Sequence, residues 1–396
     1  MANLRMRKKT SKWRSLIQSK RKLPLAFVLI FAVIGTAFVL KSFAAMMTDD
    51  ILLADQPAKG LVYSGEKIKK SGPCKGEFDL SSLDDKKKGK AHCGHIDPGP
   101  KGVDIQERAK TVDTMVSKIS KYDTEHPALQ TSDPLPTEDT PGPTAAAAIG
   151  STTGLSANVT GRNWPCTNLG VTGYRVRVIY AYQAGAPNHS STYKTFFNNT
   201  MKRVNAVIYN SSQGHRQLRL STNSDCTLDI DDVAITGNMS SLRNVESVLA
   251  SKGYDNNNKK YMVFADGGTN TPCGLGDVYS DSTANLEYND NNGLHPQYAV
   301  VWKGCWDGPE VHELMHTLGA VVPGAPHRTA GGHCYDDNDV MCYQDADNVT
   351  IWLRCKSEFY TWIYDCGKDD YFNAVNPSGW LSTHWNTANS SFLLHM

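Results

Sequence analysis

Hydrophobic and polar residues follow short-period patterns in several stretches after residue 170. YRVRVIYAY (174–182) alternates between the two classes and is rich in aromatic and β-branched residues, so it predicts a strand. Strands are also predicted for RQLRLST (216–222), LDIDDVAI (228–235), KKYMVFAD (259–266) and YAVVW (298–302). This part of the chain is therefore expected to supply the strands of a sheet.

Some of these predicted strands are separated by segments in which the apolar residues have helical spacing. Residues 190–212 and 239–253 show it, and Gly253 supplies a stop signal for the second helix. A further helix is predicted around residues 104–122. The stretch rich in Gly, Asn and Asp before YAVVW predicts a long loop, and the segment after YAVVW contains HELMH and predicts another helix. Strands followed by that helix indicate the α+β class.

The N-terminus has the pattern of a targeting segment. Residues 1–22 hold nine Lys or Arg, residues 23–40 carry no charge, and the small-residue stretch SFAA follows. Residues 1–45 are therefore predicted to be a secretory signal, cleaved after Ala44, or an uncleaved signal-anchor. Both alternatives place the rest of the chain outside the cytoplasm, either secreted or anchored to the membrane.

Composition divides the remaining chain into three regions. Residues 46–125 are rich in lysine and are a candidate propeptide; residues 126–157 are dense in Pro, Thr and Ala and predict a linker; residues 158–396 form the main domain. Without the ten bases through Lys41, the chain carries 31 bases and 40 acids, a net charge of about −9. An acidic body argues against nucleic acid as the partner.

The cysteines agree with export, because an even number in an exported chain indicates disulfides. All ten follow the apolar segment: Cys74, Cys93, Cys166, Cys226, Cys273, Cys305, Cys334, Cys342, Cys355 and Cys366. The predicted pairs are Cys74–Cys93, Cys166–Cys226 and Cys273–Cys305, with the last four paired among themselves.

The candidate chemistry lies in HELMHTLG, residues 312–319. His312 and His316 are four residues apart, so a helix places both imidazoles on one face, where they can bind one metal ion. Glu313 follows the first histidine and can reach a water molecule beside that metal without binding it. Gly319 suits the end of the helix, because it tolerates the positive φ of a sharp turn.

HELMHTLG resembles the opening of the metzincin motif H-E-x-x-H-x-x-G-x-x-H. The position of the third metzincin ligand is occupied here by Val322, which cannot bind zinc. His327 is the expected third ligand, because the loop VVPGAPH contains turn residues that can bring it back to the metal. His333 and Asp336 are the alternatives.

Downstream residues extend the resemblance. DVMCY places Met341 and Tyr343 in the Met-x-Tyr form of the metzincin Met-turn, in which the methionine packs beneath the metal site and the tyrosine can approach zinc. Residues 365–393 resemble the tail of secreted, mostly actinobacterial, metallopeptidase-like proteins. The resemblance covers roughly residues 166–393. It implies a metzincin-like fold with a twisted mixed sheet, an active-site helix and a C-terminal subdomain after the Met-turn.

This resemblance implies an extracytoplasmic zinc endopeptidase acting on a protein or peptide substrate. His312, His316 and His327 would bind Zn²⁺, Glu313 would assist the attack of zinc-bound water, and Tyr343 would donate a hydrogen bond to the oxyanion. Two other functions stay open: a non-catalytic surface protein that binds partners through a metallopeptidase fold, and a zinc hydrolase of a non-peptide substrate. The membrane is a further partner if the N-terminal segment is not cleaved.

Three other sequence features have competing interpretations. DDNDVMCYQDAD (336–347) is acidic enough for Ca²⁺ but lacks EF-hand spacing, and a solvated loop is the alternative. CGHID (93–97) resembles the propeptide thiol that caps zinc in matrix metallopeptidases. A disulfide between Cys93 and Cys74 is favoured over that role. His384 is predicted to be structural.

Overall fold

The computed structural model describes residues 68–97, 104–135, 154–167, 169–268, 272–336, 339–342, 345, 349–350, 352 and 362–396. Its strands are β1 Phe78–Asp79, β2 His92–Asp97, β3 Arg175–Gln183, β4 Arg216–Leu218, β5 Ile230–Ile235, β6 Lys259–Asp266, β7 Gly274–Tyr279, β8 Gln297–Trp302 and β9 Leu393–His395. Its helices are α2 Leu83–Lys87, α3 Ile105–Glu125, α5 Leu155–Asn158, α6 Ser190–Ser211, α7 Leu242–Ser251, α8 Glu310–Thr317 and the 3₁₀ turns η1 Lys303–Cys305, η3 Gly379–Ser382 and η4 Thr387–Asn389.

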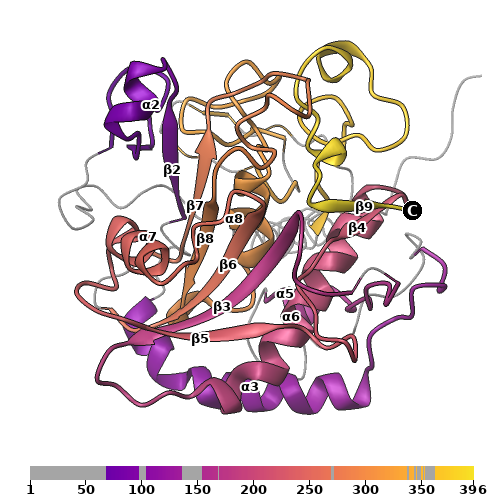
Figure 1. Cartoon of the computed structure of the whole chain (residues 1–396). Helices are drawn as coiled ribbons and strands as arrows, with labels where there is room; N and C mark the ends of the chain where they lie inside the picture. Colours follow the sequence, from indigo (N-terminus) through magenta and orange to yellow (C-terminus); the bar gives the residue numbers. More distant parts are fainter. Residues whose placement is uncertain are drawn as a thin grey trace, which may run out of the picture. The chain divides into compact units, whose positions relative to one another are not determined.

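Seven of the described strands form one mixed sheet in the order β1-β2-β7-β8-β6-β3-β5 (Figure 1). The strands β5, β3, β6 and β8 are parallel, and β7, β2 and β1 continue the sheet in antiparallel fashion. This arrangement confirms a mixed sheet with helices, consistent with the predicted α+β class. The predicted strands at 174–182, 259–266 and 298–302 correspond to β3, β6 and β8.

Helices cover both faces of this sheet because its central strands bury side chains on both sides. On one face, Val178 and Tyr180 of β3 pack in a cluster that includes residues of α6 and α8. On the other face, Ile179 and Ala181 pack in a second cluster with residues of α7. Figure 1 shows α7 on the side of the sheet away from α6. The predicted helices at 104–122, 190–212 and 239–253 correspond to α3, α6 and α7. The side chains of Asp104 and Ser241 cap α3 and α7, respectively.

Among the described strands that the sequence did not predict, β2 and β7 lie beside the candidate site. β7 occupies the stretch that was expected to be a loop, and β2 lies in the lysine-rich region 46–125. All six residues of β2 pair with β7 in antiparallel register, from His92↔Tyr279 to Asp97↔Gly274 (Figure 1). Strands from the region 46–125 and from the region after residue 158 therefore share one sheet.

Disulfides connect described residues as the sequence predicted for Cys74–Cys93, Cys166–Cys226 and Cys273–Cys305. A fourth disulfide, Cys334–Cys342, joins two of the last four cysteines. Cys366 is also disulfide-bonded. Cys355 lies outside the described residues. Several disulfides indicate folding in an oxidising compartment.

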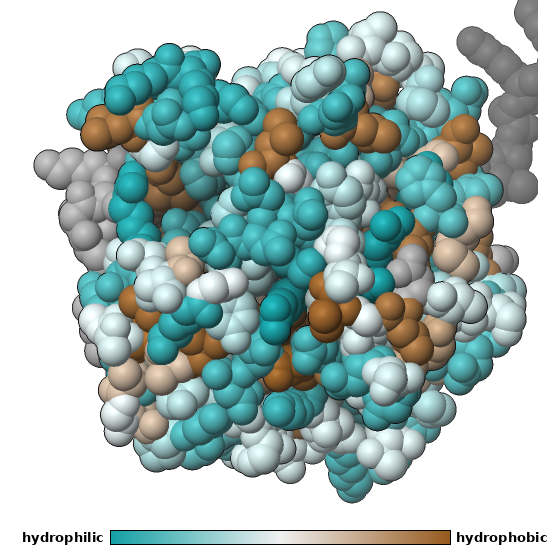
Figure 2. All heavy atoms as spheres, in the orientation of Figure 1, coloured by the Kyte–Doolittle hydropathy of each residue, from teal (hydrophilic) through white to brown (hydrophobic). Residues whose placement is uncertain are grey.

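The surface seen in Figure 2 is covered mainly by hydrophilic residues, with hydrophobic residues in small separate groups. Large exposed hydrophobic side chains such as Leu83, Tyr288 and Val375 come from different segments of the chain. Within the described ranges, no helix is long and apolar enough to cross a membrane. The predicted targeting segment at residues 23–40 lies outside those ranges.

Candidate metal centre

The helix α8 carries the HELMH residues and is fixed at both ends. At its start, the Glu310 carboxylate accepts hydrogen bonds from the backbone N–H groups of Asp307 (3.0 Å) and Gly308 (2.7 Å). At its end, Gly319 has the predicted positive φ of 83° and donates its N–H to the carbonyl of His316 (2.8 Å). The indole N–H of Trp385 donates to the carbonyl of Leu318 (2.9 Å), which satisfies one of the terminal carbonyls.

His312 and His316 lie one turn apart on α8, and both side chains are buried. Their Nε2 atoms are 3.0 Å apart. The Nδ1 of His312 is 2.8 Å from the carbonyl oxygen of Val340. Because a carbonyl can only accept, Nδ1 carries the proton and Nε2 presents a lone pair. The sequence prediction that these two histidines share one site agrees with this geometry.

Glu313 is fully buried between α8 and strand β7. Two glycines of β7 make room for it. An ideal Cβ built on Gly274 would lie 2.3 Å from Glu313 Oε1, and one on Gly276 would lie 2.6 Å from the Glu313 carbonyl oxygen. A side chain at Gly276 would push α8 away from the strand, and one at Gly274 would displace the Glu313 side chain. The glycines that made this stretch look like a loop are therefore what lets the helix approach the sheet.

His333 joins the two helix histidines from the loop that follows α8. A tight turn returns the chain at this point: the N–H of Thr329 donates to the carbonyl of His333 (2.7 Å), and the N–H of His333 donates to Thr329 Oγ1 (3.1 Å). The Nδ1 of His333 lies 3.1 Å from a carboxylate oxygen of Asp345. A histidine held by a carboxylate in this way has its Nε2 available for a metal. The neighbouring disulfide Cys334–Cys342 fixes the same segment.

A fourth histidine, His95, comes from strand β2. It pairs in register with Gly276, so its imidazole lies over the part of β7 that has no side chain. The His95 ring centroid is 4.0 Å from that of His316 and 3.8 Å from that of His333. The Nε2 atoms of His95 and His333 are in direct contact. His95 is 3% exposed, so this contact is inside the protein.

Burial keeps the four imidazoles neutral. It lowers the pKa of His312 to about 4, although the hydrogen bond to Val340 acts in the opposite direction. The pKa of His95, His316 and His333 falls well below the usual value, first through burial and then through neighbouring imidazoles and the Arg328 guanidinium. The neutral form is the one that binds metals, so all four side chains are ready to act as ligands at neutral pH.

The donor set of this group fits a transition-metal ion. Each of His95, His312, His316 and His333 offers a ring nitrogen, and these atoms all lie within 4.8 Å of one another. A buried polar group needs a partner, and a metal ion between these converging ring nitrogens would serve all four of them. Imidazole ligands suit Zn, Cu, Fe or Ni, whereas Ca²⁺ and Mg²⁺ prefer oxygen. We call this group, defined by these four residues, the histidine cluster.

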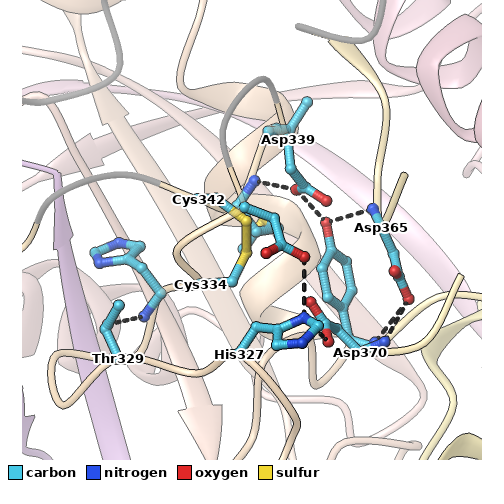
Figure 3. Close-up of a disulfide and its surroundings, with 12 residues drawn as sticks. His327, Thr329, Cys334, Asp339, Cys342, Asp365 and Asp370 are labelled. Atoms are coloured by element: carbon cyan, nitrogen blue, oxygen red, sulfur yellow. Dashed lines mark hydrogen bonds and ion pairs between the residues drawn. A yellow bond between two sulfur atoms is a disulfide. The ribbon is translucent and has the colours of Figure 1, made fainter. Parts of the chain in front are cut away.

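The structure does not bring His327 into the histidine cluster. Its Nδ1 lies 2.7 Å from an oxygen of Asp370, which lies next to it in Figure 3. The same Nδ1 lies 3.0 Å from an Asp336 oxygen, and these residues form a separate group with Asp369. The expectation of His327 as third ligand therefore differs from the geometry, and so does the alternative Asp336, which belongs to the same separate group. The alternative His333 is the residue that reaches the two helix histidines.

The reason for this difference is the course of the loop after Gly319. The Arg328 guanidinium donates to the carbonyl of Val321 (2.8 Å), so the segment between them closes on itself before it can return to α8. His327 then points to the C-terminal segment, where Asp370 lies (Figure 3). The turn around Thr329 reverses the chain and delivers His333 instead.

The predicted Met-turn is described only in part. Met341 is fully buried, and its backbone N–H donates to Asp339 Oδ1 (2.8 Å). It follows Val340, whose carbonyl contacts His312, so this segment contacts the metal-site helix through its backbone. Tyr343 lies outside the described residues, as do several positions of the acidic segment 336–347. The roles of Tyr343 and of Ca²⁺ stay predictions. His384 stacks on Trp380, with ring centroids 4.5 Å apart, as a structural residue would.

Sequence reasoning missed His95, and a signal for it existed. CGHID was noted for Cys93, which the structure shows in a disulfide with Cys74. The histidine two residues later is the one that contacts the histidine cluster. A histidine two residues from a disulfide-bonded cysteine is a weak signal alone, because only the pairing of β2 with β7 places it near α8.

Comparisons with known proteins provide no family assignment. No protein-family model matches the chain, and no curated protein matches it. Among solved structures, OgpA from Akkermansia muciniphila matches with a TM-score of 0.24 and 10% identity over 38% of this chain and 49% of that chain. Metalloproteinase-II from Bacteroides fragilis matches with a TM-score of 0.25 and 13% identity over 73% of this chain and 76% of that chain.

Proposed function

We propose that the protein is an extracytoplasmic zinc-dependent endopeptidase. The observation that carries this proposal is the convergence of His312, His316 and His333, with Glu313 buried beside them on the same helix. These three histidines, all from the chain after β8, would hold the ion. Zinc in such a site supplies Lewis-acid chemistry: it polarises a scissile carbonyl and acidifies a water molecule. Disulfides among the described residues support an oxidising compartment.

The protein's own residues would orient the metal ligands, transfer the proton and stabilise the oxyanion. His312 is oriented by the Val340 carbonyl and His333 by Asp345, so both imidazoles are held in the tautomer that binds a metal. Glu313 would accept the proton of the attacking water and pass it to the leaving amine. Tyr343 would donate a hydrogen bond to the oxyanion, as its place in the Met-x-Tyr sequence suggests.

Glu313→Gln tests this function. The variant keeps the shape of the side chain but cannot accept the proton, so it should retain its zinc and its fold while proteolysis falls about 10²–10⁴-fold. Cleavage of unfolded protein substrates is measured for the wild-type sequence and the variant at equal zinc content, after each chain has been cut between residues 97 and 104 so that the histidine of strand β2 does not occupy the site. Equal activity of the two proteins would refute the role of Glu313.

One observation favours a second function, a non-catalytic metal-binding protein. Structural zinc sites have four protein ligands, whereas catalytic sites keep a position for water. The histidine cluster offers four ligands when His95 is included. Zinc-loaded protein that cleaves no protein, peptide, ester or amide substrate, even with His95 replaced, would favour this second function. Activity on small esters or amides alone would instead indicate a hydrolase of non-peptide substrates.

A further inference from the structure

We infer that the segment 68–97 holds the metal centre closed, with His95 as a fourth metal ligand that must be withdrawn before a substrate can reach the ion. This inference rests on the proposed function, because it concerns the regulation of the same site. It assigns a role to the lysine-rich region ahead of the linker, which was predicted to be a candidate propeptide.

The position of His95 is set by strand pairing. His95 lies opposite Gly276 in the antiparallel register of β2 and β7. An ideal Cβ on Gly276 would lie 3.1 Å from the Cβ of His316, so this point of the strand is directly against the metal-site helix. With no side chain at Gly276, the imidazole of His95 can occupy this space and contact His316 and His333.

A fourth nitrogen ligand changes what the centre can do. Zinc is almost always four-coordinate in sites made only of protein side chains, and a catalytic zinc uses three protein ligands and one water. His312, His316 and His333 provide three ligands, so His95 takes the remaining position. The centre is then saturated, and no place is left for a water molecule or a scissile carbonyl.

The same segment also covers the strand edge beside the centre. β2 pairs with β7 over six residues, so it occupies the hydrogen-bonding edge that β7 would otherwise present. Extended peptides commonly bind by adding a strand to such an edge. A peptide that approached α8 along β7 would therefore compete with β2 for the same backbone groups.

The contacts of the segment are compatible with its release as a unit. Its disulfide, Cys74–Cys93, lies within the segment itself. The other disulfides formed between described residues all lie after residue 165. The segment's side chains reach the rest of the protein through ion pairs such as Glu77–Arg328 (2.8 Å) and through buried apolar residues such as Phe78. These contacts are not covalent, so the segment can separate once the chain after it is cut.

The test uses the full chain with Co²⁺ in place of zinc, because the visible absorption of Co²⁺ reports its ligands. Azide, a small anion that binds only to an accessible coordination position, is titrated into wild type, His95→Ala and His92→Ala. His92 is the matched control: it is on the same strand, but it stacks on Tyr279 and pairs with Asp277 (3.2 Å). His95→Gln provides a second variant of similar side-chain volume, and thermal unfolding confirms that each protein is folded.

Azide should leave the spectra of wild type and His92→Ala unchanged and should shift the absorption bands of both His95 variants, which keep about one Co²⁺ per chain. A wild-type spectrum that responds to azide as the variants do would overturn the inference, because the fourth position would already be open. Loss of Co²⁺ from both folded His95 variants would also overturn it, because His95 would then be a permanent structural ligand.

The same experiment separates this inference from the proposed function. If wild type binds no metal, both fail. If the His95 variants show the predicted azide response but no proteolysis even after the chain is cut between residues 97 and 104, the closing role of His95 stands and the peptidase function fails.

Discussion

Gly276→Ala tests whether α8 lies against β7 as closely as the metal centre requires. The added Cβ would lie 2.6 Å from the carbonyl oxygen of Glu313 and 3.0 Å from its Oε2. A carbon and a carbonyl oxygen approach comfortably at about 3.3 Å, so strand and helix must separate by about 0.7 Å. The contact is with backbone, which cannot rotate away. Overpacking of this kind costs about 1–3 kcal/mol.

The expected result of Gly276→Ala is a melting temperature lower by roughly 2–12 °C, because each kcal/mol lowers the melting temperature of a large domain by about 2–4 °C. Because α8 carries His312 and His316, the shift also moves two ligands away from His333. The rise in melting temperature on adding zinc should therefore be smaller than in wild type.

The assay for Gly276→Ala is thermal unfolding with EDTA and with added zinc. Gly308→Ala is the control, because Gly308 precedes α8 and has no atom within 4 Å of an added Cβ. A Gly276→Ala protein that melts like Gly308→Ala under both conditions would refute the close approach of helix and strand.

Three further predictions follow from the structure. His333→Ala should lose most zinc affinity whereas His327→Ala should keep it, as measured by competition with a chromophoric chelator; the reverse order would restore His327 as third ligand. Gly274→Ala places a Cβ 2.3 Å from Glu313 Oε1, so it should displace that carboxylate and, in chains cut between residues 97 and 104, reduce proteolysis at unchanged zinc content; activity equal to that of the cut wild type would contradict this. Burial lowers the pKa of Lys260 to about 7 from 10.5 in the unfolded chain, so the folded state binds fewer protons between these values and its stability rises with pH. Lys260→Met should therefore stabilise the protein by at most roughly 5 kcal/mol at and below pH 7, with the gain disappearing towards pH 10.5 in denaturant unfolding; a pH-independent gain would contradict the reasoning.

The parallel part of the sheet and its helices were accessible from the sequence because their apolar patterns are long and regular. KKYMVFAD predicted β6 with the observed bounds, and the helix spacing of residues 239–253 predicted α7. These elements pack against large apolar clusters, so their sequences need only place apolar residues at regular intervals on the buried faces. The same holds for His312 and His316, since a helix alone fixes their relation.

The rest of the site depends on contacts between distant segments, which local patterns do not encode. The β7 segment predicts a loop because glycine has a low strand propensity. Gly274 and Gly276 are nevertheless needed there, because a larger side chain at either position would collide with Glu313 of α8. His95 enters the histidine cluster only through the pairing of β2 with β7. His327 is held away from the histidine cluster by its ion pairs with two aspartates, and the turn at Thr329 directs His333 into the cluster. Spacing from His316 could not distinguish the two.

The central claim is that one metal ion is bound by the histidine cluster, and anomalous X-ray diffraction at the zinc absorption edge tests it most directly. Crystals of the full chain grown with zinc should show a strong anomalous peak about 2.0–2.1 Å from a ring nitrogen of each of His312, His316 and His333, with His95 completing the set. An anomalous map with no peak at that position, or with its strongest peak between His327 and Asp370, would contradict the account.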